Sequence, residues 1–357
     1  MNGQTLQPLV IEPKETTAIW GGDALLRVYG KHGDPSATIG ESWECWDENT
    51  IRGGAYAGKS IAELRSLLGK RLMGTLDSAR LFPVLTKIID ARQNLSVQVH
   101  PNDAYAQRVE HEPFGKTECW VILAAEPGAE LVLGWTKDTT REEYERRVKD
   151  GTLGDILRRV KVKPNDAFYL PSGTLHAIGA GIQLFETQQA SDLTYRIFDW
   201  NRVGQDGKPR QLHVDKAADV LNYAAGTTAQ TKHLKYEIDG IGYETYIADP
   251  RFVVERAGVT GWNGDLRPDG EPIILMTNDA AMTLSVDGIA TQLDRWTTAL
   301  IPAETASAKL AASSPQALAL VVTPSRDAFV RRLERAGVGA AQRDAFLAQF
   351  GATPAGV

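Results

Sequence analysis

The chain has 357 residues, of which 43% are hydrophobic and 24% are charged, the composition of an ordinary globular protein. A formal net charge of -6 and the absence of a basic run argue against nucleic acid or an anionic membrane as the main partner. No stretch approaches the roughly 20 apolar residues that a membrane-spanning helix needs. This length usually exceeds what one hydrophobic core organises, so we expect a soluble protein of two domains.

Two features predict a cytoplasmic protein. The N-terminal apolar run covers only residues 9–11, between Pro8 and Glu12, and is too short for a signal peptide. The two cysteines, Cys45 and Cys119, lie far apart, and each stands beside a tryptophan. We therefore expect buried free thiols in a reducing compartment rather than a disulfide.

Short β-strands dominate the predicted elements. Residues 39–46 alternate between polar and apolar side chains, as expected of a strand. Residues 61–68 instead show helical spacing of apolar residues after Ser60, a candidate N-cap, and Gly69 marks the end of this helix.

A polar insertion near residues 139–159 interrupts the strands. Its opening at Thr140, followed by acidic residues, predicts a helix, and a second short helix is expected at 153–158. Both helices are excursions from a β-framework.

Candidate metal ligands occur on the two strands predicted around the turn at 101–103. Strict alternation puts Gln98 and His100 on one face of the first strand. On the returning strand, Lys116 and Glu118 share a face in the same way. If both strands face one interior, an amide oxygen, an imidazole and a carboxylate converge there.

A second imidazole, that of His176, would complete a four-ligand site. It lies on the strand that follows the turn Pro171-Ser-Gly. Taken singly, each of these residues also has an ordinary interpretation, as a hydrogen-bonded core histidine or a solvated strand side chain. The combined spacing is less generic than its parts and predicts one divalent ion. Ligands drawn from His, Glu and Gln suit zinc, but also iron or manganese.

A short internal repeat links the two halves of the chain. Residues 167–174 parallel residues 298–305, each an apolar strand broken by proline and resumed at threonine. In this register Ser307 stands where the first half has His176, and no histidine follows His233. We infer two related β-barrels, the second without a metal, although so short a match also arises by chance.

The expected organisation is therefore a metal-binding domain that contains the helical insertion, a second β-rich domain and a helical tail. A stretch of small and polar residues, 222–232, precedes the first boundary. The expected limits of the three parts are residues 1–235, 236–325 and 326–357.

Four runs of the sequence resemble the type I mannose-6-phosphate isomerases in their short bacterial form. These runs are Leu95–Pro101, Gly115–Trp120, Pro171–Ala177 and Glu186–Arg196. The resemblance extends in order from about Trp20 to about Leu221 and is highly specific. The C-terminal third resembles the family mainly in length and β-character.

The resemblance implies a mainly β enzyme of two cupin-type (jelly-roll) barrels with helical insertions and a helical tail. It also implies one zinc ion per chain and the interconversion of mannose 6-phosphate and fructose 6-phosphate. The family's metal ligands fall on the residues that strand geometry had selected, Gln98, His100, Glu118 and His176. Its active-site arginine falls on Arg196, but its phosphate-binding lysine has no clear counterpart here. A small sugar phosphate is then the expected partner of a monomer or homodimer.

Three residues are candidates for the chemistry. Moving a carbonyl between C1 and C2 needs a proton carrier and positive charge near the enediolate formed between them. We assign the role of proton carrier to Glu186. This carboxylate follows the apolar run 182–185, and its burial there should raise its pKa. Arg196 suits the phosphate or the enediolate, and Lys116 adds charge on the strand face of Glu118. The alternatives are an ordinary strand glutamate for Glu186 and a structural salt bridge for Arg196.

Two other functions remain open at this level. Two histidines and one glutamate also match the facial triad of a cupin iron dioxygenase. A non-catalytic sugar-binding cupin would keep the fold without turnover. Gln98 as a fourth ligand, together with Lys116 and Arg196, favours the isomerase, because these groups suit an anionic sugar better than oxygen activation.

Overall fold

The computed structural model describes residues 5–203, 207–225, 230–312, 314 and 317–350. The chain folds into two compact units that are not consecutive in the sequence. Unit 1 comprises the described parts of residues 1–14, 43–86 and 232–351, and unit 2 those of 15–42 and 87–231. The domain limits expected at 235 and 325 remain a prediction. The last part of the expected helical tail, 351–357, lies outside the described residues.

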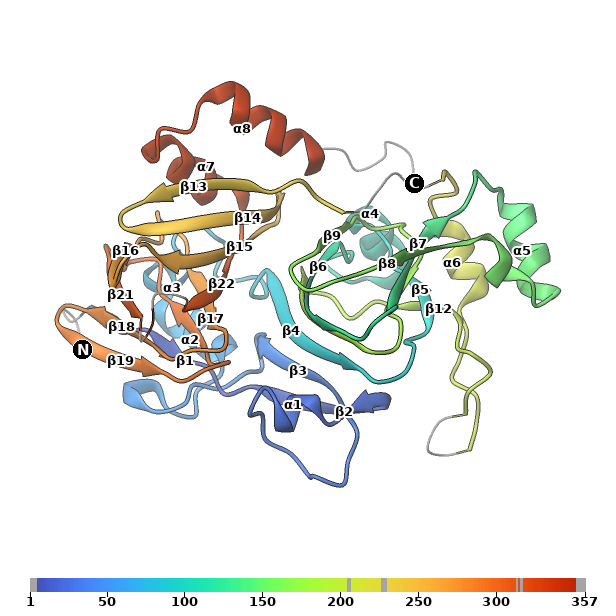
Figure 1. Cartoon of the computed structure of the whole chain (residues 1–357), viewed down its shortest axis with the longest axis horizontal. Coiled ribbons are helices and arrows are strands. Elements are labelled where there is room, and N and C mark those ends of the chain that lie inside the picture. Colours follow the sequence, from blue (N-terminus) through green and yellow to red (C-terminus); the bar gives the residue numbers. More distant parts are fainter. Residues whose placement is uncertain (1–4, 204–206, 226–229, 313, 315–316, 351–357) are drawn as a thin grey trace. The chain divides into compact units, whose positions relative to one another are not determined.

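Unit 1 contains two antiparallel sheets (Figure 1). The first has seven strands in the order β1 (Leu9–Val10), β20 (Thr298–Ile301), β17 (Ile273–Thr277), β22 (Leu318–Thr323), β15 (Phe252–Val259), β14 (Ile241–Asp249) and β13 (Leu234–Ile238). The second has four strands in the order β16 (Asn263–Leu266), β21 (Ala308–Ala312), β18 (Met282–Val286) and β19 (Ile289–Leu293). Apolar side chains of both sheets, such as Leu275 and Leu284, are fully buried in one cluster. The sheets therefore share a hydrophobic core.

The helix predicted after Ser60 is confirmed as α2 (Ile61–Leu68). The Ser60 hydroxyl accepts a hydrogen bond from the Glu63 amide, and the Glu63 carboxylate accepts one from the Ser60 amide. This capping box satisfies two amides that have no partner within the helix. The other helical segments of unit 1 are η1 (Gly54–Tyr56), α3 (Lys70–Met73), α7 (Arg326–Arg335), α8 (Ala340–Leu347) and η4 (Ala348–Phe350).

Unit 2 also contains two sheets, and its strands carry the candidate site. The first sheet has six strands in the order β2 (Lys14–Gly22), β3 (Ile39–Cys45), β4 (Val84–Ala91), β11 (Ile182–Gln189), β6 (Glu118–Ala125) and β9 (Ala167–Leu170). The second has five strands in the order β12 (Tyr195–Phe198), β5 (Val97–Val99), β10 (His176–Ala177), β7 (Glu130–Trp135) and β8 (Leu157–Lys161). Both sheets contribute side chains to a buried cluster, among them Trp120 and Leu133. One interior therefore lies between the two sheets.

Helices cover the other face of the five-stranded sheet. The predicted insertion contains α5 (Arg141–Lys149), which begins after Thr140, whose hydroxyl accepts a hydrogen bond from the Glu143 amide. α5 lies beside α6 (Val214–Val220) in Figure 1, and the Tyr144 hydroxyl donates to the Val214 carbonyl. The remaining helical segments of unit 2 are α1 (Ala24–Arg27), α4 (Asp103–Tyr105), η2 (Ala106–Glu110) and η3 (Leu153–Ile156). The second helix expected in the insertion is shorter than predicted, because Leu157 already begins β8.

Strand alternation separates apolar from polar side chains in β5. Val97 and Val99 are buried with Tyr144 in the cluster under the helices. Gln98 lies between them in sequence, so its side chain points to the opposite face of the strand, toward the interior between the sheets. This interior is where the site lies.

Cys45 and Cys119 are both buried free thiols, as the sequence predicted. Among the residues that the structure describes, no helix is long and apolar enough to cross a membrane.

Candidate metal centre

The side chains of His100, Glu118 and His176 in unit 2, which could hold a metal ion, converge as the sequence predicted. One ligand atom each of His100, Glu118 and His176 lies within 4.8 Å of the other two. The Nε2 atom of His176 is 3.0 Å from Glu118 Oε1, and the Nε2 atom of His100 is 3.5 Å from Glu118 Oε2. All three side chains are only 1% exposed. The cluster is therefore buried and compact enough for one ion.

Strand pairing across long sequence separations builds this cluster. His176 at the start of β10 lies opposite Gln98 of β5, directly after which the chain continues to His100. The Gly173 amide also donates to the His100 carbonyl, which ties the turn before β10 to the end of β5. Gly173 has a φ of +87°, and a Cβ there would lie 2.9 Å from the Val220 carbonyl oxygen. Only glycine suits this turn, because other residues are strained there.

Backbone carbonyls fix the orientation of both imidazole rings. The Nδ1 atom of His100 lies 2.8 Å from the Leu193 carbonyl oxygen, and Nδ1 of His176 lies 2.8 Å from that of Thr174. A carbonyl can only accept, so Nδ1 carries the proton in each ring. In this tautomer Nε2 is the ring nitrogen that faces Glu118 and is available as a ligand atom. This is how metal-binding histidines are usually oriented.

Electrostatics keep the cluster in the protonation states of a ligand set. Burial, reinforced by the charge of Lys116, holds the pKa of His100 well below its usual value, so this ring is neutral. Burial alone would raise the pKa of Glu118, but the positive charge of Lys116, 3.6 Å away, opposes burial, and the pKa is lowered. Glu118 is therefore an ionised carboxylate in a buried site.

Potential ligand atoms of the cluster are not satisfied by hydrogen bonds from the described part of the protein. Within the described part of the chain, His100 Nε2 and both carboxylate oxygens of Glu118 are buried without a hydrogen bond. Burying a carboxylate without hydrogen bonds is costly, and a cation at the centre of the cluster would relieve this cost. The residues present thus fit a divalent metal ion.

Two further predicted residues border the cluster. The Gln98 amide nitrogen lies 3.4 Å from His176 Nε2, and a half-turn of the amide would bring the Gln98 oxygen to that position. Lys116 is buried, with Nζ 3.6 Å from Glu118 Oε2. Gln98 therefore lies where a fourth ligand would be needed, and Lys116 adds a positive charge beside it.

A cavity of about 350 Å³ opens next to these residues. Its lining includes all of the remaining candidates and one lysine that the sequence had not singled out: Gln98, Lys116, Glu186, Arg196 and Lys87. Arg196 on β12 lies opposite Gln98 in the sheet, so both side chains leave on the same face. The volume lies in the range of small-ligand sites.

Glu186 is held inside this cavity by two contacts. The Trp120 indole donates to Oε1 over 2.9 Å, and Lys87 Nζ lies 3.5 Å from Oε2. Burial, aided by the charge of Glu118, raises the pKa of Glu186, as expected from its apolar strand. This carboxyl can therefore exchange a proton more readily near neutral pH than an exposed glutamate can.

Lys87 was missed by the sequence reasoning. It is 3% exposed, and its Nζ also lies 3.2 Å from Glu41. Burial opposes its charge, but Glu41, Glu186 and Asp192 raise its pKa, so it stays protonated. A lone lysine inside the apolar run 81–89 was the available signal, because a lysine is rarely buried unless it is paired.

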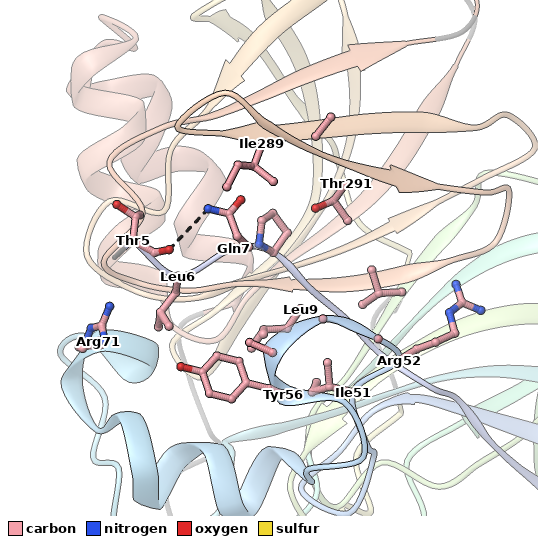
Figure 2. Close-up of a pocket in the computed structure, with 16 residues that line it drawn as sticks. Thr5, Leu6, Gln7, Leu9, Ile51, Arg52, Tyr56, Arg71, Ile289 and Thr291 are labelled. Atoms are coloured by element: carbon pink, nitrogen blue, oxygen red, sulfur yellow. Dashed lines mark hydrogen bonds between the residues drawn. The ribbon is translucent and has the colours of Figure 1, made fainter. Parts of the chain in front are cut away.

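A larger cavity in unit 1 is not a second chemical site. It measures about 540 Å³ and is lined by three short segments and Arg71, as Figure 2 shows. Its described lining contains no histidine, cysteine, aspartate or glutamate. Carboxylates, lysines and a histidine line the smaller cavity of unit 2, which is therefore the better candidate for catalysis.

Solved structures define the class of protein. The crystal structure of the mannose 6-phosphate isomerase of Bacillus subtilis has a TM-score of 0.81 and 30% sequence identity, covering 89% of this chain and 99% of that one. A zinc-bound mannose 6-phosphate isomerase has a TM-score of 0.73 over 90% of this chain and all of that one. Its 14% identity shows a shared fold alone. Fold and site together are those of a mainly β sugar phosphate isomerase with a potential metal centre.

Sequence comparison then identifies the family. The catalytic-domain model of type I phosphomannose isomerase matches residues 9–142. The mannose-6-phosphate isomerase ManA of Bacillus subtilis is 41% identical over 261 residues, covering 72% of this chain and 81% of that protein. The mannose-6-phosphate isomerase of Streptococcus mutans is 38% identical over 260 residues, with 71% and 80% covered. The chain belongs to the type I phosphomannose isomerases.

Proposed function

We propose that this isomerase interconverts mannose 6-phosphate and fructose 6-phosphate through an enediol, with one zinc ion per chain. The ion would be held by Gln98, His100, Glu118 and His176. The observation that carries this proposal is the set of buried atoms without hydrogen bonds on His100 and Glu118. When bound, the ion would polarise the sugar oxygens and stabilise the negative charge that develops on the oxygens of C1 and C2. Zinc suits the ligand set and is named for a protein of the same fold.

Glu186 is the proton carrier in this proposal. It lines the cavity, and its raised pKa lets it accept a proton from one carbon and return it to the other. The Trp120 indole and Lys87 hold its two oxygens in place. A fixed carboxyl is needed because the proton moves between two adjacent carbons of one bound sugar.

Lys116 and Arg196 supply fixed positive charge on either side of the ligands. Lys116 adjoins Glu118, and Arg196 lies across from Gln98 in the sheet. Both residues line the cavity. Positive charge in a water-poor cavity stabilises an enediolate more strongly than it would in solution.

We also propose that the fold consists of two cupin-type barrels and that the protein is located in the cytoplasm. Two cupin-type barrels, as the resemblance implies, would account for two sheets around a shared core in each unit. The free thiols Cys45 and Cys119 suit the reducing cytoplasm, where sugar phosphates are metabolised.

A second candidate function is a cupin iron dioxygenase. It is favoured by one observation, that the compact cluster consists of two histidines and one glutamate. Several basic side chains line the adjacent cavity, and these suit an anionic sugar better. Oxygen consumption with the iron-loaded protein and mannose 6-phosphate would support this alternative.

A coupled assay tests the main proposal. Formation of fructose 6-phosphate from mannose 6-phosphate is measured before chelation, after chelation and after zinc is returned. We expect activity to disappear with the metal and to return with it. Activity that persists in protein with no detectable metal would contradict the proposed centre.

A further inference from the structure

The cavity beside the metal cluster has a second group of basic side chains. Arg196, Arg210 and His213 all line it, and of these the sequence reasoning had selected only Arg196. Arg210 and His213 come from the segment between β12 and α6, outside any strand. They share a cavity with Gln98 and Glu186, so a ligand bound near the metal cluster can also reach them.

Arg210 is held in place by a buried carboxylate. Asp199, which is 5% exposed, accepts two hydrogen bonds from Arg210, from Nε over 2.7 Å and from Nη2 over 2.6 Å. The same carboxylate accepts a bond of 2.6 Å from Arg202, which also donates to the Asn94 carbonyl. The bidentate contact between Asp199 and Arg210 fixes both the position and the plane of the Arg210 guanidinium.

The group carries more positive than negative charge. Among the residues that the structure describes, the guanidiniums of Arg196, Arg202 and Arg210 surround one carboxylate, that of Asp199. Burial and then the charge of Arg210 lower the pKa of Arg196, which shows that the two cations repel one another. Such an arrangement is unfavourable unless an anion balances it.

Arg196, Arg210 and His213 each have an N–H group that could donate a hydrogen bond to that anion. Arg196 uses Nε on the Ser96 hydroxyl and Nη1 on the Gln211 carbonyl, and the described residues provide no hydrogen-bond acceptor for its Nη2. Arg210 Nη1 is likewise without an acceptor among them. The Arg196 amide donates to Nδ1 of His213, so a neutral His213 carries its proton on Nε2 and can donate there.

We propose that Arg210, positioned by Asp199, binds the phosphate of the substrate together with Arg196 and His213. The site would thereby select phosphorylated over neutral sugars. This inference rests on the proposed function for the identity of the substrate. Three charged or polar donors in a fixed arrangement match a phosphate monoester, whose oxygens accept hydrogen bonds in several directions. Asp199 does not line the cavity and would act on the phosphate by positioning Arg210.

Arg210→Gln tests the assignment in the zinc-loaded enzyme. We expect KM for mannose 6-phosphate to rise about ten-fold to a hundred-fold, because a hydrogen-bonded charge is lost. The value of kcat should stay within about two-fold, since the phosphate is bound equally in ground and transition states. Zinc content should not change. An unchanged KM, or a loss confined to kcat, overturns the proposal.

Two controls separate binding from structural damage. Arg141→Gln removes the same charge from an exposed ion pair with Asp219 outside the cavity, and KM should not change. Arg210→Lys keeps the charge but loses the planar, bidentate geometry of the guanidinium, so its KM should fall between those of the wild type and Arg210→Gln. Asp199→Asn should raise KM and leave kcat within about two-fold, as expected of a positioning residue. A normal KM in Asp199→Asn removes it from the proposal.

A binding measurement keeps this test independent of the proposed reaction. Inorganic phosphate should raise the melting temperature of the zinc-loaded wild type and of Arg141→Gln, but not that of Arg210→Gln. An equal effect on all three proteins overturns the phosphate site even if the isomerase reaction is confirmed. A selective loss in Arg210→Gln supports the site even if mannose 6-phosphate proves not to be the substrate.

Discussion

At the scale of single residues, the site depends on side chains held by neighbours that do not take part in the chemistry. The carbonyls of Leu193 and Thr174 orient His100 and His176. The indole of Trp120 donates to Glu186. Each contact restricts a side chain before any substrate arrives, so less ordering is needed when the substrate binds.

The substitution Glu186→Gln tests the proposed role of this residue as the proton carrier. The amide keeps the shape of the carboxyl but cannot carry a proton, so we expect turnover to fall by about a hundred-fold or more. Zinc content and KM should change little, because Glu186 is not among the proposed ligands. The measurement is kcat with metal content determined on the same sample. Near-normal turnover would remove Glu186 from the mechanism.

At the scale of elements, α7 forms a buried ion pair with the seven-stranded sheet of unit 1. Arg332 of α7, 1% exposed, pairs with Glu255 of β15, which is fully buried. The hydroxyls of Tyr236 and Thr245 also donate to Glu255. The Arg332 guanidinium lies 5.1 Å from the centroid of the Tyr243 ring. This network joins the helix to three strands of the seven-stranded sheet.

Removing the arginine should therefore destabilise the protein strongly. Arg332→Ala leaves Glu255 buried without its cation, which typically costs about 3–5 kcal/mol of unfolding free energy. Arg27→Ala is the control, because Arg27 and its partner Asp23 are 76% and 50% exposed, and its loss should cost far less than that of Arg332. Urea unfolding of both variants measures the difference. Equal stabilities would show that the ion pair does not anchor α7.

A second ion pair of unit 1, between Arg71 and Glu304, contributes stability that depends on pH. Glu304 accepts hydrogen bonds from Arg71 of α3 over 2.6 Å and 2.7 Å, and from the Leu6 amide. The bond from Arg71 lowers the pKa of Glu304 below its usual 4.5. Because the folded pKa is the lower one, the link contributes stability above pH 4.5 and loses it as pH falls through the folded pKa.

The comparison of wild type with Glu304→Gln measures this effect. We expect the wild type to be the more stable protein at about pH 7, and the difference in stability to disappear only as the pH falls below 4.5 and through the lowered pKa of Glu304. Urea titrations over this range give the gap directly. A gap that does not change with pH would mean that the charge of Glu304 contributes nothing.

At the scale of the whole molecule, metal binding and folding should be coupled. The cluster joins β5, β6 and β10, whose residues are up to 78 positions apart in the sequence. An ion bound there holds these strands together and binds the folded chain better than the unfolded one. Its binding free energy then adds to the free energy of unfolding.

Zinc should therefore raise the thermal stability of the chelated protein. Free zinc at a hundred times its Kd adds about 2.7 kcal/mol to the unfolding free energy. His100→Ala and His176→Ala should lose this response, their bound metal and their activity together. Calorimetry and metal analysis provide the readouts. A folded His100→Ala variant with stoichiometric zinc would show that the ligand assignment is wrong.

Part of the candidate site was predictable because its signals are local. In a strand, neighbouring side chains alternate between faces, so Gln98 with His100 and Lys116 with Glu118 could be paired from the sequence alone. The predicted convergence of His100, Glu118 and His176 is confirmed by their ligand atoms. The helix after Ser60 was equally visible, since caps act over three residues.

The sequence by itself thus determined the mainly β character, the capped helix and which side chains share a strand face. Each of these depends on neighbours a few residues away. Only the tertiary structure decided that Lys87 and Arg210 line the same cavity as Gln98, and that residues 43–86 belong to the compact unit of residues 232–351. These outcomes depend on which distant strands pair, and pairing is decided by burial of whole sheet faces, which local sequence patterns do not encode.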